Sequence, residues 1–190
     1  MIAELIDELV VVLDTCVLAP MPLADLLLRG AEAPALYRVA WSSAILDELR
    51  RTLGKFGLSE MQIGRRLRAM ESAFPEANIA HPEGFLDKVP ELPDPDDRHV
   101  LAAAIASEAN VIVTLNLRHF PAERTGPIGV TVLSPDEFLL RLFHLTPDVL
   151  LEKLDAQANA IGLPRADITE RLRDAVPGLL KAVNEWTRAR

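Results

Sequence analysis

Short runs of apolar residues alternate with longer segments of helical periodicity along most of this 190-residue chain. The first run, Val10 to Leu13, is too short for a helix and ends at the polar pair Asp14-Thr15. Such a run is typical of a strand that is buried on both faces of a parallel sheet. We expect the other strands at residues 37–41, 77–80, 111–114 and 129–133.

The segments between these strands have the apolar spacing of helices, at residues 23–33, 43–53, 59–73 and 98–109. Ser42 or Ser43 is a suitable N-cap for the second helix, and Ser134, followed by a proline and two acids, opens a further helix. The acids that end the loop at residues 92–97 can cap the helix that follows them. Strands that alternate with helices form βαβ units, so the pattern predicts a three-layer α/β/α fold around a parallel sheet of about five strands.

The predicted strands stop near residue 145, and the rest of the chain has only helical patterns. We therefore expect one domain at residues 1–145 and a C-terminal helical extension at residues 146–190. The extension is predicted to contain one helix that opens at Thr146 and a second from about Asp167 to Trp186. Leucines 150, 151 and 154 form an apolar stripe, from which we expect the extension to pack against the domain.

The composition, 49% hydrophobic and 25% charged, is that of a globular chain. A single cysteine, Cys16, excludes an internal disulfide and favours a reducing cytoplasm. The first eight residues carry acids where a secretory signal would carry lysine or arginine, and no apolar run approaches the roughly 18 residues of a membrane span.

The formal net charge of −8 means that the protein as a whole is not attracted to nucleic acid. The distribution of charge over the surface matters more than the net charge, however. One stretch is basic, with a single acid, Glu60, against six basic residues: Arg50, Arg51, Lys55, Arg65, Arg66 and Arg68. This stretch is either a solvated helix face or a contact surface for RNA.

Four polar residues are expected at the carboxyl edge of the predicted sheet, where open parallel sheets bind ligands. Asp14 follows the first strand, Glu48 lies in the helix after the second, Asp97 precedes a helix, and Asn116 follows the fourth strand. Carboxylates brought close together repel one another unless a cation neutralises them. Hard oxygen ligands suit Mg²⁺ or Mn²⁺ better than zinc. Such an ion can polarise a phosphodiester and lower the pKa of an attacking water.

Four segments resemble, in order along the chain, the four motifs of PIN domains. They are residues 11–18, 41–49, 94–104 and 112–120, with the sequences VVLDTCVL, WSSAILDEL, DPDDRHVLAAA and IVTLNLRHF. The resemblance covers about residues 8–140. It implies a PIN-like fold and a metal-dependent ribonuclease, within the branch of VapC-like toxins that pair with an antitoxin protein. Members of the family commonly form homodimers.

The resemblance implies a catalytic and metal-binding set of Asp14, Glu48, Asp97 and Asn116, with Asp96 as a further ligand. Supporting roles are expected for four neighbouring polar residues: Thr15, Ser43, Asp94 and Thr114. The fourth motif usually carries aspartate where this chain has Asn116. An amide oxygen can bind a hard cation but supplies no charge, and Asp94 or Asp96 could compensate.

Two other functions fit parts of the pattern. A phosphatase or phosphotransferase of the HAD type also has an aspartate after the first strand, but it would need a second aspartate at the position of Cys16. A PIN fold with a decayed metal site, kept as a binding module for RNA or protein, is favoured by Asn116 and opposed by the three intact carboxylates. A nucleophilic role for Cys16 lacks a histidine nearby in sequence, and the four histidines lack metal-ligand spacing.

Overall fold

The computed structural model describes residues 9–190 and contains one parallel sheet with the strand order β3-β2-β1-β4-β5. The strands are β1 (Val10–Leu13), β2 (Arg38–Ser42), β3 (Asn78–Ile79), β4 (Val111–Val113) and β5 (Thr131–Leu133). The predicted α/β fold with a five-stranded parallel sheet is confirmed. The acidic start of the chain, from which we expected no secretory signal, lies outside the described residues.

The central strand β1 is buried along its whole length, as its unbroken apolar sequence predicts. It pairs in parallel with β2 on one side and β4 on the other, and Val11 lies opposite both Val39 and Val111. The chain passes outwards from β1 to β2 and β3 and then returns across the sheet to β4 and β5. The strand order reverses at β1, and folds of this kind bind ligands beyond the carboxyl ends of the strands at such a reversal.

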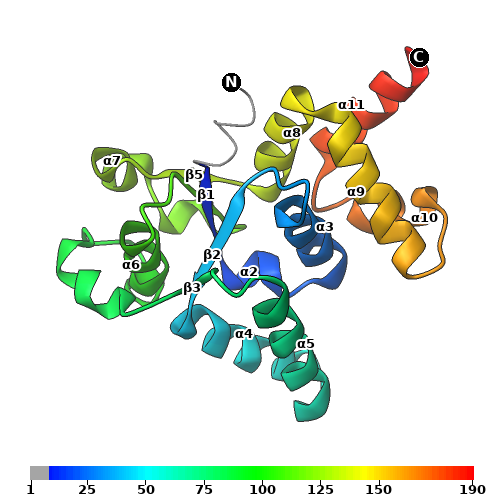
Figure 1. The fold of residues 1–190 in the computed structure, drawn as a ribbon. Coiled ribbons are helices and arrows are strands. Elements are labelled where there is room, and N and C mark those ends of the chain that lie inside the picture. Colours follow the sequence, from blue (N-terminus) through cyan, green and yellow to red (C-terminus); the bar gives the residue numbers. More distant parts are fainter. Residues whose placement is uncertain (1–8) are drawn as a thin grey trace.

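Helices cover both faces of the sheet, which Figure 1 shows nearly edge-on. Helix α6 (Arg98–Ala106) packs against β1, β2 and β4 and against the 3-10 turn η1 (Pro82–Lys88), and α7 (Ala122–Thr125) lies on the same side. The opposite face carries α3 (Met21–Ala31) and α8 (Pro135–Leu145). The predicted three-layer arrangement is therefore present. Three further 3-10 turns are short: η2 (Pro95–Asp97), η3 (Leu117–His119) and η4 (Gly126–Ile128).

Three helices gather at the carboxyl edge of the sheet: α2 (Thr15–Leu18), α4 (Ser43–Lys55) and α5 (Glu60–Ala73). Ser42, and not Ser43, caps α4, because its hydroxyl accepts the Ile45 backbone N–H. Ser59 and Gln62 form a reciprocal capping box at the start of α5. The Ser42 cap fixes where α4 begins, and so it fixes the direction in which the side chains of α4 leave the edge of β2.

The C-terminal segment contains three helices, α9 (Pro147–Ala160), α10 (Arg165–Leu172) and α11 (Pro177–Arg188). Our prediction of a single helix from about Asp167 to Trp186 is wrong. Pro177 occupies the first turn of α11, and the preceding residue, Val176, has φ −139° and ψ 55°. Proline disfavours the helical conformation in the residue before it, so the helix ends and a new one begins.

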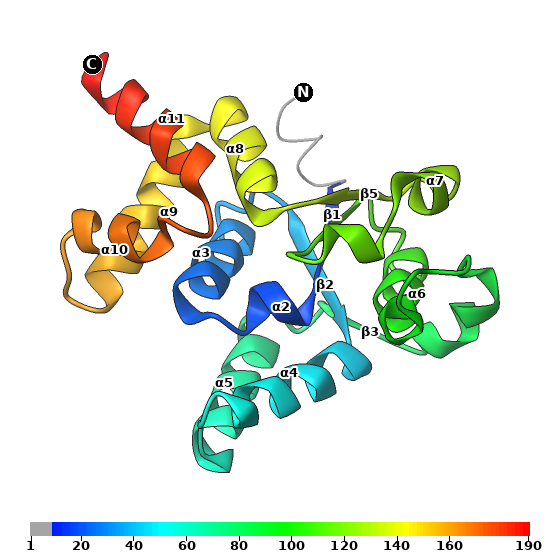
Figure 2. The same ribbon diagram turned by 180° about the vertical axis from the view of Figure 1, so that it is seen from behind.

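These three helices pack on the face of the molecule that carries α3 and α8 (Figures 1 and 2). Leu150 and Leu154 are fully buried, and Leu151 is 8% exposed. Lys153 and Gln157 of α9 donate to backbone carbonyls at the two ends of α3, at Glu32 and Pro22 respectively. Asp136 of α8 accepts two backbone N–H groups at the start of α11. Across residues 9–190, the structure contains no helix that is both long and apolar enough to cross a membrane.

Candidate active site

Asp14 lies at the carboxyl end of the central strand and is only 3% exposed. Its backbone N–H continues the ladder to β4 by donating to the Val113 carbonyl at 3.1 Å. Its Oδ2 atom accepts the Thr114 hydroxyl at 2.6 Å, so the first residues beyond β1 and β4 are joined side by side. The strand pairing therefore sets the position of this carboxylate, and Thr114 sets its orientation.

Glu48 reaches the same edge from α4. Its Oε2 atom accepts the Thr15 hydroxyl at 2.9 Å and lies 3.3 Å from His99 Nε2 of α6. The His99 ring and the Thr15 hydroxyl hold the pKa of Glu48 below its usual value, although burial acts in the opposite direction. Burial lowers the pKa of His99, but its contacts with Glu48 and with the Asp96 carbonyl outweigh burial and raise it. Glu48 is therefore kept ionised.

Asp97 approaches from the turn before α6. It is the N-cap residue of that helix, but its side chain makes no capping hydrogen bond, which corrects our prediction that the last acids of the loop cap the helix. The Asp97 carboxylate instead contacts His119, with 2.6 Å between Asp97 Oδ2 and His119 Nδ1. Asp94 instead caps the short turn η2 through the Asp96 backbone N–H.

The remaining predicted residues differ in how closely they join this group. Asn116 is half-buried, and its backbone N–H donates to the Thr114 hydroxyl at 3.0 Å. Ser43 and Asp96 are exposed, and the contacts recorded for Asp96 are made by its backbone. The structure thus brings together Asp14, Glu48 and Asp97, with Thr15, Thr114 and Asp94 beside them, and places Ser43 and the Asp96 carboxylate outside the hydrogen-bonded group.

The carboxylates of this group are close enough to affect one another. Burial raises the pKa of Asp97, and the negative charges of Asp14 and Asp94 raise it further, while the His119 contact opposes them. Carboxylate oxygens of Asp94 and Asp97 and a ring nitrogen of His119 all lie within 4.8 Å of one another. An acid whose ionised form is destabilised by burial and by like charges is stabilised by a cation. The carboxylate oxygens of this group fit a divalent cation that prefers oxygen ligands.

Cys16 contacts the Asp14 carboxylate at 3.1 Å and the Thr114 hydroxyl at 3.3 Å. Burial, and then the Asp14 charge, raises the pKa of this thiol to about 12. The thiol therefore stays protonated at neutral pH and cannot serve as a nucleophile. Its contact with the Asp14 carboxylate nevertheless makes Cys16 part of the hydrogen-bonded group at the sheet edge.

The basic stretch is divided between exposed and structural residues. Arg66 is half-buried and donates to the backbone carbonyls of Leu18 and Ala19, so it ties α5 to the end of α2. Arg50 pairs with Glu60 at 3.2 Å. Arg51 is exposed on α4 and is close enough to Glu48 to help lower its pKa. Lys55, Arg65 and Arg68 are exposed.

The site residues predicted from the sequence did not include two histidines that contact the acidic group. His99 contacts Glu48, and His119 contacts Asp97. Both lie inside the segments that carried the resemblance, His99 two residues after Asp97 and His119 three residues after Asn116. Their position inside these segments could have indicated that they lie near the acidic group. The spacing between the histidines could not.

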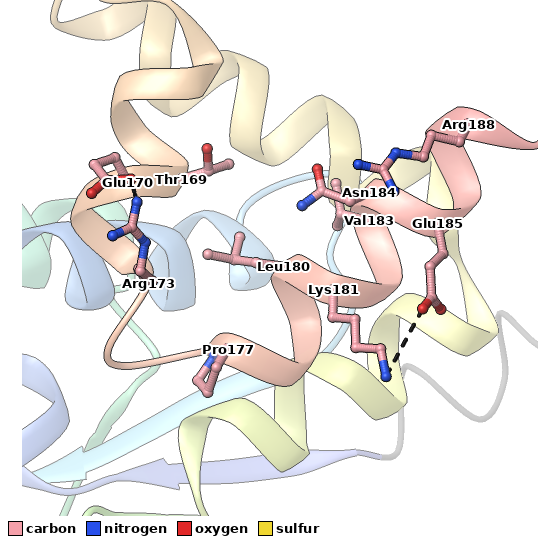
Figure 3. Close-up of a pocket in the computed structure, with 10 residues that line it drawn as sticks. All are labelled: Thr169, Glu170, Arg173, Pro177, Leu180, Lys181, Val183, Asn184, Glu185 and Arg188. Atoms are coloured by element: carbon pink, nitrogen blue, oxygen red, sulfur yellow. Dashed lines mark hydrogen bonds and ion pairs between the residues drawn. The ribbon is translucent and has the colours of Figure 1, made fainter.

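A groove of about 530 Å³ lies elsewhere, between α10 and α11 (Figure 3). Its lining includes Arg173, Leu180, Lys181 and Arg188, and none of the predicted site residues. Glu170 and Glu185 pair with Arg173 and Lys181 respectively, so most of its charge is already balanced. This groove is separate from the acidic group at the sheet edge.

Comparison with known proteins agrees with the fold and with the first three motifs and most of the fourth. The family model described as PIN domain matches residues 10–118, more than half of the chain. A protein of Mycobacterium tuberculosis (strain ATCC 25618 / H37Rv), named putative ribonuclease VapC50, is 41% identical over 85 residues, which are 43% of this chain and 50% of that protein. The match thus spans half the length of this curated relative, and no solved structure matches the chain. On its family match, its sheet order and its acidic edge, this chain belongs to the PIN-domain family.

Proposed function

We propose that this protein is a metal-dependent ribonuclease that hydrolyses RNA phosphodiester bonds. The observation that carries the proposal is the placement of Asp14, which is 3% exposed at the end of the central strand and contributes to the raised pKa of Asp97. A buried carboxylate next to other carboxylates is costly unless an ion compensates it. The similarity to a putative ribonuclease supports the same activity.

In this proposal the catalytic and metal-binding residues are Asp14, Glu48, Asp97 and Asn116, with Asp96 as a further ligand. Bound Mg²⁺ or Mn²⁺ would supply a Lewis acid for the phosphodiester and a lowered pKa for the attacking water. The Thr114 hydroxyl donates a hydrogen bond to Oδ2 of Asp14, and the Thr15 hydroxyl donates one to Oε2 of Glu48. Within residues 9–190 no hydrogen bond is recorded for Asp14 Oδ1, which leaves this atom to face the ion.

The exposed basic residues of α4 are proposed to hold the RNA backbone. Arg51 and Lys55 follow Glu48 at three and seven residues, so helical spacing places them along one side of α4, leading away from the acids. Arg50, Arg65 and Arg68 are further candidates, whereas Arg66 is engaged with the backbone carbonyls of α2 and its end. Each phosphate contact that is lost should reduce the salt dependence of RNA binding.

The name of the relative, VapC50, also supports a role as the toxin of a toxin–antitoxin pair. We therefore propose an antitoxin protein as a partner. The resemblance to PIN domains, whose members commonly form homodimers, supports a homodimer as the working assembly. The cytoplasm is the expected compartment, because the chain has a single cysteine.

The test is cleavage of a mixed RNA pool by purified wild type and by Asp14→Asn, each with Mn²⁺, Mg²⁺ or EDTA. The proposal predicts cleavage that requires the metal and falls by at least about 100-fold in the variant, as is usual when a group that stabilises the transition state is removed. Cleavage that persists in EDTA, or that is equal in the variant, would contradict it.

The second candidate function is a PIN-fold binding module for RNA or protein, and Asn116 is the observation that favours it, because this position supplies no charge. Calorimetry with Mn²⁺ separates the two functions. A ribonuclease site should bind the ion, and a decayed site should not. If the wild type binds Mn²⁺, exchanging Asn116→Asp should strengthen binding.

A further inference from the structure

The fourth motif touches the acidic group through a residue other than Asn116. Within residues 9–190, no side-chain hydrogen bond is recorded for Asn116, whereas His119, three residues later, contacts Asp97. We propose that His119 is a positioning residue, which holds the Asp97 carboxylate for a divalent cation by donating its Nδ1 proton to Oδ2. This inference rests on the proposed function and assigns a role that the resemblance did not supply.

The hydrogen-bond network defines the protonation of the His119 ring. Arg118 donates its Nε–H to His119 Nε2 at 3.2 Å. Arginine is always protonated and has no acceptor atom, so His119 Nε2 must offer a lone pair. In the neutral ring the proton then lies on Nδ1, which faces Asp97 Oδ2 at 2.6 Å and Asp94 Oδ2 at 3.7 Å. One neutral tautomer therefore satisfies both contacts.

This protonation separates positioning from ligation. Asp94, Asp97 and His119 are close enough together to hold a metal ion by distance alone. The nitrogen that faces the two carboxylates carries the proton, however, and a ring nitrogen binds a metal only through its lone pair. By donating to Oδ2, His119 leaves the other oxygen of Asp97 for the ion. Metal-binding carboxylates are commonly held in this way by a hydrogen-bond donor outside the coordination sphere.

The backbone around His119 is suited to holding a side chain in one place. His119 ends the turn η3, and its own N–H donates to the Asn116 carbonyl at 2.9 Å. The next residue, Phe120, is 2% exposed, so the turn is anchored in the core. The side chains of His119 and Asp97 are 20% and 16% exposed. Because Asp97 makes no capping hydrogen bond to α6, His119 is the contact that fixes its orientation.

The experiment measures Mn²⁺ binding by calorimetry, in the absence of RNA, for wild type, His119→Ala and His119→Asn. His119→Ala removes the donor and should weaken Mn²⁺ binding about 10- to 100-fold, the usual effect of losing such a partner. The amide N–H of the asparagine variant can take the place of Nδ1–H, so His119→Asn should recover most of the affinity. His81→Ala is the matched control, because His81 is exposed and pairs with Glu83, and it should bind as the wild type does.

Three results would overturn the proposal: unchanged affinity in His119→Ala, equal losses in the alanine and asparagine variants, or no Mn²⁺ binding by the wild type. Equal losses would indicate that the ring itself binds the ion. Melting temperatures of all variants, measured in EDTA, show whether a loss of affinity reflects unfolding. A wild type that binds Mn²⁺ through a positioned Asp97 but does not cleave RNA would refute the proposed function and leave this inference standing, so the two failures are distinguishable.

Discussion

The carboxyl edge of the sheet and the C-terminal helices both bury charged side chains, but they compensate them differently. In the C-terminal region Lys153, which is 6% exposed, donates to the carbonyls of Glu32 and Ala33 at the end of α3. Asp136 accepts the Gly178 and Leu179 N–H groups at the start of α11. Each charge meets a helix end of opposite partial charge, which offsets part of the cost of burial, although burial still lowers the pKa of Lys153.

At the carboxyl edge the compensation is incomplete. Asp14 is held by a threonine hydroxyl and a protonated thiol, and its charge raises the pKa of Asp97. The nearby basic residue Arg51 helps to lower the pKa of Glu48. The C-terminal region thus sets each of these charges against a helix end. The sheet edge instead leaves like charges side by side, which costs stability and supports the proposed cation site.

The largest effect on stability is expected for a substitution in α9. Leu154 is fully buried, so Leu154→Ala should lower the free energy of unfolding by about 2–5 kcal/mol. Denaturant unfolding measures the loss, and Mn²⁺ binding should remain at the wild-type level, because Leu154 belongs to α9 and not to the acidic group. A loss below about 1 kcal/mol would indicate that the C-terminal helices contribute little to stability, and would favour treating residues 146–190 as a separate unit.

A smaller loss is expected at the cap of α11. Asp136→Ala removes the acceptor of two backbone N–H groups and should lower the free energy of unfolding by about 1–2 kcal/mol. Asp136→Asn keeps one acceptor oxygen and should lose less. Thermal melts of the two variants provide the comparison. Equal stability of wild type and Asp136→Ala would show that α11 needs no cap from α8.

The smallest expected effect has the opposite sign. Asp97→Asn removes a charge but keeps an acceptor for His119, so in EDTA at pH 7 it should raise the melting temperature by about 1–2 °C. The folded-state pKa of Asp97 is raised, so its ionised form costs stability above that pKa. The cost disappears as pH falls below the unfolded-state pKa, where Asp97 is neutral in both states.

Melting curves of wild type and Asp97→Asn, recorded in EDTA from neutral to acidic pH, should therefore converge as the pH falls. A lower melting temperature for the variant at pH 7 would contradict this expectation, because it would mean that Asp97 stabilises the protein without a metal ion.

Much of this arrangement could be predicted from the sequence, because local patterns determine it. The apolar run at residues 10–13 defines the central strand, and the residue that follows such a strand must lie at the carboxyl edge. Ser59 and Ser134 cap helices as their sequence contexts predict. Pro177 breaks the helix that we expected to continue, and this local signal outweighs the apolar spacing around it.

The contacts that orient the carboxylates could not be predicted in this way. His119 and Asp97 are 22 residues apart and belong to different turns, and Glu48 meets His99 across two helices. Such pairs depend on how α6 and the turn after β4 pack against the sheet, which no local pattern encodes. Asp97 likewise contacts His119 and does not cap α6, because tertiary packing brings His119 within reach of its carboxylate.

If the acids at the sheet edge form the proposed cation site, RNA cleavage depends on the occupancy of that site. The most direct test records Mn²⁺ binding and the initial rate of RNA cleavage in one buffer, over the same range of Mn²⁺ concentration. We expect the two curves to coincide for the wild type and both to be lost in Asp14→Asn. Leu154→Ala should retain both under conditions in which it is folded. Cleavage that saturates without Mn²⁺ binding, or Mn²⁺ binding that survives in Asp14→Asn, would contradict this expectation.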